Sequence, residues 1–222
     1  NQLNAKAVIQ FDGINDFIDS SSLGITHSCF FAVVAKTNNN STGRDFLFDG
    51  LSPATNTRSI IALNHESKIQ LWANNWSKSN FNTPSGYFVM TAIFNSNNSS
   101  LSLNGTTVNG LNPGTSILTS GIRIGAHASL QDYLYGSIAE FFVIENAGST
   151  ETQSNVESYL ANKWGLVDQL PASHPGRKNV LLTATSLDYE TNASTYNINV
   201  RATANGSVQN EKEYKILLSN VF

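Results

Sequence analysis

Turn-forming residues recur along this sequence about every ten residues, and short runs rich in apolar residues lie between them. This spacing is too short for helices of ordinary length and is typical of strands joined by tight turns. Two pairs of runs flank Asn- and Ser-containing loops and are predicted hairpins: 59–63 with 68–72, and 87–94 with 99–103. The pattern therefore predicts an all-β sandwich or barrel.

The remaining runs divide into further strands and one helix. The run at 30–35 is almost continuously apolar, so we expect a strand that is buried on both faces. Residues 149–164 instead carry apolar residues at helical spacing, with Gly165 as a stop signal. We predict one short amphipathic helix that packs on the sandwich, Trp164 included. Other predicted strands are 7–11, 46–48, 106–108, 122–125 and 136–144.

Composition restricts the classes of partner. Hydrophobic residues make up 40% of the chain, which is enough for a substantial core, whereas charged residues make up only 13%. The polar surface must come largely from uncharged residues, among them 28 asparagines, as is common in extracellular adhesive proteins. The net charge is −3 and basic residues do not cluster, so we expect no nucleic-acid partner. No apolar run reaches the roughly 18 residues of a membrane span, so no membrane insertion is predicted.

Five motifs in order resemble the laminin-G-like domains of the concanavalin-A-like lectin/glucanase class. They are V-I-Q-F-D-G-I-N-D-F-I at 8–18, L-S-L-N-G at 101–105, I-R-I-G at 122–125, Y-G-S-I-A-E at 135–140 and S-Y-L-A-N-K-W-G-L at 158–166. The resemblance implies a concanavalin-A-like jelly-roll sandwich over residues 1–170 that ends in one short C-terminal helix. Residues 171–179, which contain Pro, Ser and Gly, are predicted to be a linker.

The C-terminal stretch 180–222 resembles the second half of a cadherin-like repeat. The resemblance rests on L-D-Y-E at 187–190 and Y-N-I-N-V-R-A-T at 196–203. It implies a three-stranded segment of the Ig-like sandwich type, with strands at 180–184, 195–203 and 212–218. Ala204 stands where such repeats carry Asp, which argues against cadherin-type calcium binding. Three strands are marginal alone, so we expect a neighbouring segment or chain to complete the sandwich.

Catalysis is not expected, although glucanases share the fold that the resemblance implies. A retaining glycosidase needs two carboxylates about 5 Å apart, and a strand would supply them at alternate positions. Residues 1–170 contain no such acidic cluster, and the alternating pair Asp188 and Glu190 falls in the cadherin-like stretch. The four histidines show no zinc-ligand spacing. We therefore predict a protein that is not an enzyme.

Calcium is the candidate cofactor. The resemblance implies a Ca²⁺ ion at a rim of the sandwich, with Asp132 as an acidic ligand shortly before the strand that begins near Gly136. The partner position in the family corresponds to Asn56 or, earlier in the chain, Asp49. Oxygen donors of these residue types suit Ca²⁺. The alternative is that Asp132 is a solvated loop residue.

Two groups of residues are predicted to contact a ligand. Trp76 follows Asn74 and Asn75, so a loop there would offer an aromatic face for a sugar ring and amides for its hydroxyl groups. His127, Tyr133 and Tyr135 lie near Asp132 in the sequence and form the second group. Trp72 ends an apolar alternation and is expected in the core.

These observations predict an extracellular or cell-surface binding and adhesion module that recognises a glycan or an extracellular protein as part of a larger protein. The alternative is a structural subunit or spacer of an extracellular assembly, joined to neighbouring domains or subunits through the cadherin-like strands.

Overall fold

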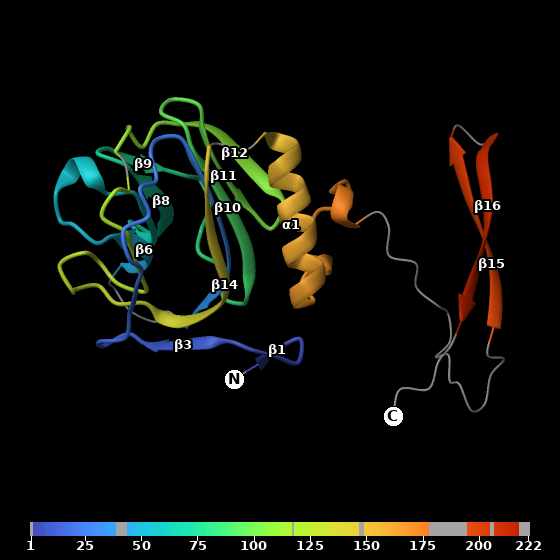
Figure 1. Cartoon of the computed structure of the whole chain (residues 1–222), viewed down its shortest axis with the longest axis horizontal. Helices are drawn as coiled ribbons and strands as arrows, with labels where there is room; N and C mark the ends of the chain where they lie inside the picture. Colours follow the sequence, from blue (N-terminus) through green and yellow to red (C-terminus); the bar gives the residue numbers. More distant parts are fainter. Residues whose placement is uncertain are drawn as a thin grey trace. The chain divides into compact units, whose positions relative to one another are not determined.

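A computed structural model describes residues 2–38, 44–116, 118–146, 149–177, 195–204 and 207–217 of the chain. The chain divides into two units, residues 1–179 and 180–222. The first unit contains two six-stranded antiparallel sheets and one α-helix (Figure 1). This architecture is the jelly-roll sandwich that the motifs imply. None of the described helices is both long and apolar enough to span a membrane.

The first sheet has the order β12-β11-β10-β5-β14-β3, and the second has the order β4-β13-β6-β7-β8-β9. The first sheet contains β3 (Ile9–Asp12), β5 (Cys29–Thr37), β10 (Phe88–Phe94), β11 (Ser99–Leu103), β12 (Thr106–Leu111) and β14 (Tyr135–Glu145). The second contains β4 (Ile18–Asp19), β6 (Asp45–Gly50), β7 (Ile60–His65), β8 (Lys68–Trp72), β9 (Trp76–Lys78) and β13 (Ile122–Ile124). A small ribbon of β1 (Gln2–Leu3) and β2 (Lys6–Ala7) precedes them.

Both predicted hairpins are confirmed. Strands β7 and β8 pair with Ile60 opposite Trp72, and strands β10 and β11 pair with Met90 opposite Leu103. The Asn104-Gly105 turn then joins β11 to β12, and Gly105 takes a φ of +77°, a conformation that glycine adopts without the steric penalty of a Cβ. The short-range turn chemistry therefore determines the pairing of these strands.

The two sheets enclose an aromatic core. Phe31 of β5 stacks on Phe48 of β6 with ring centres 4.3 Å apart, and Phe94 of β10 meets Phe31 edge-on at 5.2 Å. Cys29 is buried in the same cluster, and burial raises the pKa of its thiol to about 12. The Cys29 side chain therefore behaves as a small hydrophobic group.

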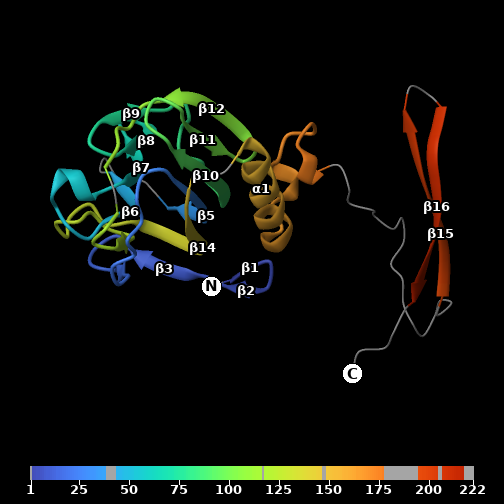
Figure 2. The ribbon, with the colours of Figure 1, turned by 45° about the horizontal axis from the view of Figure 1, so that its top comes forward.

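Helix α1 (Thr150–Trp164) forms a third layer on the outer face of the first sheet (Figure 2). It begins where the Ser149 side chain accepts a hydrogen bond from the Thr152 backbone N–H, and it ends at Gly165, whose φ is +71°. Leu160 and Trp164 pack in one cluster with residues of β5 and β10. The predicted helix and the packing role of Trp164 are both confirmed.

Residues 171–177 do not form the open linker that the sequence predicts. His174 is buried, and its Nε2 lies 3.0 Å from Oε2 of Glu157 on α1. The Gly176 backbone N–H donates to His174 Nδ1, so Nε2 carries the proton and donates to Glu157. The segment, which includes the short helix η3 (Pro175–Arg177) and follows η2 (Val167–Gln169), is held against α1. The boundary between the units therefore follows Asn179.

In the second unit, β15 (Thr195–Ala204) and β16 (Ser207–Leu217) form a long antiparallel hairpin with a bulge between Ala202 and Thr203. The predicted strand at 195–203 is confirmed, whereas the strand predicted at 212–218 begins earlier, at Ser207. The strand predicted at 180–184, together with Asp188 and Glu190, lies outside the described residues.

Replacing His174 with Ala leaves Oε2 of the buried Glu157 without its donor. Because an unsatisfied buried acceptor is costly, we expect the free energy of unfolding to fall by about 1–3 kcal/mol, measured by urea denaturation. Asn155→Ala, at an exposed position on the same helix, is the matched control and should change it by less than about 0.5 kcal/mol. Equal midpoints for the two variants would show that this contact does not hold segment 171–177 in place.

Candidate ligand-binding face

The outer face of the second sheet carries the candidate site. Helix α1 covers the outer face of the first sheet, and β6, β8 and β9 lie on the opposite side of the sandwich (Figures 1 and 2). Successive residues of a strand point to opposite faces, so Ile61 and Leu71 enter the core between the sheets while Ile60 and Trp72 face outward. The outward residues Phe46, Ile60, Ala62 and Trp72 form a separate buried cluster against which Trp76 packs.

The strand register places charged and aromatic residues of this face in neighbouring positions. Arg123 of β13 pairs with Asp19 of β4 on one side and with Asp49 of β6 on the other. Further across the sheet, Trp72 of β8 pairs with Trp76 of β9. Residues paired in this way lie side by side on the same face. One end of the face is therefore ionic and the other aromatic.

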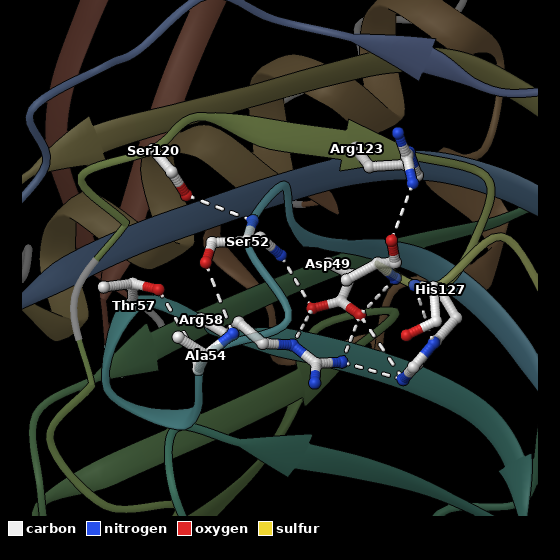
Figure 3. A network of polar contacts seen from close by, with 11 residues as sticks. Asp49, Ser52, Ala54, Thr57, Arg58, Ser120, Arg123 and His127 are labelled. Carbon is white, nitrogen blue, oxygen red and sulfur yellow. Dashed lines mark hydrogen bonds and ion pairs between the residues drawn. The ribbon is translucent and has the colours of Figure 1, made fainter.

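Arg58, which follows the short helix η1 (Thr55–Thr57), joins these two ends. Figure 3 shows its contacts with Asp49 and His127 at the ionic end. Its Nε donates to Asp49 Oδ1 at 2.8 Å and its Nη2 donates to Asp49 Oδ2, so the ion pair is bidentate. The guanidinium carbon also lies 5.3 Å from the centre of the Trp72 ring, in a cation–π contact. Arg58 is therefore fixed from both sides.

The aromatic end consists of Trp72, Trp76 and His65, which we call the aromatic row. The ring centres of Trp72 and Trp76 lie 6.3 Å apart with an interplanar angle of 54°. The His65 ring stacks on Trp76 at 4.4 Å and 24°. Trp72 is buried as predicted, whereas Trp76 is only half-buried and retains solvent-accessible surface at the edge strand β9. Trp76 is thus held in one orientation while part of it meets solvent.

His127 completes the ionic end. Its Nε2 lies 2.8 Å from Arg58 Nη2, and its ring meets Phe46 edge-on at 5.0 Å. Arginine can only donate, and the Ser129 backbone N–H donates to Nδ1 at 3.1 Å, so hydrogen-bond donors lie at both ring nitrogens. Burial lowers the pKa of His127 below its ordinary value, and although the Asp49 charge opposes this, the Arg58 charge lowers it further. The imidazole is therefore neutral near pH 7.

The structure brings together two of the residues predicted to contact a ligand. Trp76 and His127, predicted as members of separate groups, belong to one continuous series of contacts that runs through Trp72 and Arg58. Asn74 and Asn75 are exposed beside Trp76, and the Asn75 side chain donates to the Asn112 carbonyl at 2.9 Å.

The two predicted tyrosines do not join this series of contacts. Tyr133 donates its hydroxyl to the Leu130 carbonyl at 3.1 Å, within its own loop. Tyr135 is 45% exposed, but it belongs to β14 of the first sheet, where it pairs with Asp12 of β3. Closeness in sequence to His127 therefore does not place Tyr135 on the same face.

The predicted calcium ligands do not fit one site. Asp49 is fully buried, and in addition to Arg58 it accepts hydrogen bonds from the backbone N–H groups of Gly50 and Ala128 at 2.7 and 2.8 Å. A carboxylate bound in this way serves the Arg58 ion pair, so the assignment of Asp49 as a calcium ligand is corrected. Asn56 is exposed on η1, and Asp132 is half-buried. Within the described ranges, no group of three or more His, Cys, Asp or Glu residues is placed to hold a metal.

A second carboxylate, which the sequence did not single out, lies at the other end of β6. Asp45 is buried, and its Oδ2 accepts hydrogen bonds from Thr37 Oγ1 and Asn64 Nδ2, each at 3.0 Å. Burial raises the pKa of Asp45, and the nearby charge of Asp132 adds to the rise. Thr37 and Asn64 also line a polar cleft of about 320 Å³.

Arg58, His65 and Arg123 are site residues that the sequence prediction missed. Arg58 follows a polar loop and His65 ends a strand, and neither position carries a local motif. Arg123 lies inside the I-R-I-G motif, where an arginine between two apolar strand residues indicates an outward position. The alternation of apolar and polar residues could therefore have identified Arg123, whereas no local signal identifies Arg58 or His65.

No protein-family model and no curated protein matches the sequence. Solved structures match its fold at low identity. Domain 4 of AbnA, an extracellular arabinanase of Geobacillus stearothermophilus, has a TM-score of 0.55 and 14% identity over 68% of this chain and 76% of that one. The sialidase NanB has a TM-score of 0.53 and 16% identity over 68% of this chain. A SAP-like pentraxin of Limulus polyphemus has a TM-score of 0.52 and 14% identity over 68% of this chain and 81% of that one.

These matches show that the chain shares the jelly-roll fold of these structures. The matched region spans only 27% of the sialidase chain, so the fold occurs there within a larger protein.

The lowered pKa of His127 predicts a specific pH dependence. Since the folded pKa lies below the unfolded value of about 6.5, the unfolded chain binds the proton first as the pH falls. The stability contributed by neutral His127 is present above about pH 6.5 and is lost as the pH falls through the folded pKa. We expect His127→Gln to lose less unfolding free energy than the wild type between about pH 7.5 and about pH 5.5, measured by urea denaturation.

The comparison must be made between variant and wild type, because the raised pKa of Asp45 acts in the opposite direction on the wild-type curve. If the unfolding free energies of the two proteins changed in parallel with pH, the lowered pKa of His127 would be contradicted.

Proposed function

We propose that the sandwich is a non-catalytic saccharide-binding module and that the outer face of the second sheet is its binding surface. The observation that carries the proposal is Trp76, an indole that Trp72 and His65 hold in place at the sheet edge and that is only partly buried. The C–H face of a sugar ring packs against such an aromatic surface. A pre-oriented ring loses little conformational entropy on binding.

Polar groups beside Trp76 support the proposal. Asn74 and Asn75 are exposed in the turn between β8 and β9, and amides can both donate to and accept from sugar hydroxyl groups. Asn74 has a φ of +89°, and the Asn75 backbone N–H donates to the Pro113 carbonyl at 2.8 Å. The turn is therefore anchored to the neighbouring loop, which gives its side chains defined positions.

The carboxylates of this face favour binding over hydrolysis. Asp49 forms a bidentate ion pair with Arg58, and Asp19 forms a bidentate ion pair with Arg123. A general acid must carry a proton, whereas an arginine ion pair keeps a carboxylate deprotonated. A nucleophilic carboxylate must reach the anomeric carbon, whereas both oxygens of these carboxylates are already bound.

The proteins that share the fold support an extracellular context and a place in a larger protein. One match is a domain of an extracellular arabinanase solved with arabinotriose, and another is part of a sialidase chain. The alternative, a spacer in an extracellular assembly, would leave the aromatic row without a ligand.

A glycan array probed with the whole chain tests the proposal. Trp76→Ala removes the stacking surface, so we expect every wild-type signal to weaken at least about tenfold. Tyr159→Ala is the matched control, because Tyr159 is 51% exposed but lies on α1, against the other sheet. The absence of any glycan signal from the wild type would favour the spacer, and equal losses in both variants would exclude Trp76 as the platform.

Calcium dependence is a separate proposal that rests on Asp132 alone, whose charge acts on Asp45. A bound cation would stabilise the fold by mass action, so CaCl₂ should raise the melting temperature of the wild type but not of Asp132→Ala. Asp168→Ala, at a fully exposed aspartate, is the control and should keep the shift. An equal shift in Asp132→Ala would remove Asp132 from any calcium site.

A further inference from the structure

We propose that the polar cleft beside Asp45 is a second binding site, for a single sugar unit that carries a carboxylate, as a uronic acid does. The cleft lies between the C-terminal end of β5, Asn64 of β7 and residues 83–85, and it includes no residue of the aromatic row. Its volume of about 320 Å³ falls at the lower end of the range for small-molecule pockets, about 300–1,000 Å³. The inference therefore goes beyond the proposed function.

A buried carboxylate fixes part of the lining of the cleft. Asp45 is 2% exposed, and its Oδ2 holds the side chains of Thr37 and Asn64 through hydrogen bonds of 3.0 Å each. Its Oδ1 accepts from the Tyr135 backbone N–H at 3.3 Å. Both oxygens of Asp45 are thus already bound, and Asp45 positions the lining instead of contacting a ligand itself.

The segment 83–85 is attached to the same wall. The Asn64 backbone N–H donates to Thr83 Oγ1 at 3.2 Å. Pro84 follows, and its ring restricts the backbone φ at that position. Because these contacts exist without a ligand, the cleft is largely preformed, and binding would require little ordering of the chain.

Lys36 is the charged residue of the lining. It is half-buried on β5, and its Nζ lies 6.0 Å from the centre of the Tyr87 ring in a cation–π contact. Among the residues that the structure describes, Lys36 has no carboxylate partner. An unpaired ammonium group in a partly enclosed cleft favours a ligand that brings a negative charge.

The neutral groups of the lining match hydroxyl groups. Thr83 Oγ1 accepts the bond from Asn64, which leaves its own proton for a ligand. Within the described part of the chain, Asn64 Oδ1 and the side-chain amide of Asn38 have no hydrogen-bond partner. The cleft can therefore donate to and accept from hydroxyl groups, so a hydroxylated carboxylate fits it better than a simple anion.

A two-dimensional NMR titration of the whole chain tests the inference, because it reports both affinity and location. The ligands are D-galacturonate and D-glucuronate, the neutral counterparts D-galactose and D-glucose, and acetate as the bare carboxylate. We expect one uronate to bind at least about fivefold more tightly than its neutral counterpart and than acetate, with shifts at the residues that line the cleft. Its affinity should fall when NaCl is raised to about 0.5 M, because salt screens the ion pair.

Lys36→Gln removes the charge that would pair with the carboxylate. We expect this variant to bind the uronate at least about fivefold more weakly, whereas Lys36→Arg, which keeps the charge, should retain most of the affinity. Lys6→Gln, at an exposed position on β2, changes the net charge equally and should leave the affinity unchanged. If Lys36→Gln does not fold, Thr83→Val serves instead and should weaken binding about twofold to tenfold, since it removes one hydroxyl donor.

Each remaining outcome contradicts a stated part of the inference. Equal affinity for a uronate and its neutral counterpart would remove the role of the Lys36 charge, and equal affinity for acetate would remove the sugar. No uronate binding, or shifts confined to residues outside the cleft, would overturn the site. Trp76→Ala should leave uronate affinity within about twofold, so failure at the aromatic row and failure at the cleft are distinguishable.

Discussion

Burial of β5 on both faces is the constraint on which the three-layered unit depends. Alternate residues of this strand enter two different cores: Phe31 and Val33 pack between the sheets, whereas Phe30 and Val34 pack under α1. A strand of this kind cannot lie at the surface, since either face would expose several large apolar side chains. The second sheet must cover one face and the helix the other. The outer face of the second sheet remains, and it carries the proposed binding surface around Trp76.

The candidate binding face depends on a smaller constraint, the buried ion pair of Asp49 and Arg58. The carboxylate receives four hydrogen bonds from three residues, and so the buried charge is compensated. This arrangement fixes the guanidinium over Trp72, and Trp72 in turn contacts Trp76. The orientation of the exposed aromatic surface is therefore linked through direct contacts to a carboxylate that no solvent reaches.

Local sequence patterns were sufficient for most elements of the first unit. The apolar run at 30–35, the Asn104-Gly105 turn and the capping residues Ser149 and Gly165 each carry their own signal, because strand burial, turn geometry and helix ends depend on residues close in sequence. The same reasoning failed for residues 171–177. Pro and Gly there indicate a break in regular structure, but they do not reveal that the chain folds back and brings His174 into contact with Glu157 of α1.

The sequence by itself determined the fold class, the positions of most strands along the chain, the helix and Trp76 as a candidate aromatic platform. Tertiary structure alone decided which polar residues surround that platform. His127 is 69 residues from Arg58 along the chain, and only the tertiary fold brings its ring within hydrogen-bonding distance of the Asp49–Arg58 ion pair. The same geometry separated Tyr135 from His127, because a residue on β14 belongs to the other sheet. The hydrophobic periodicity that predicts strands and helices depends on residues close in sequence. The contacts between charged side chains instead form only when distant segments of the chain come together.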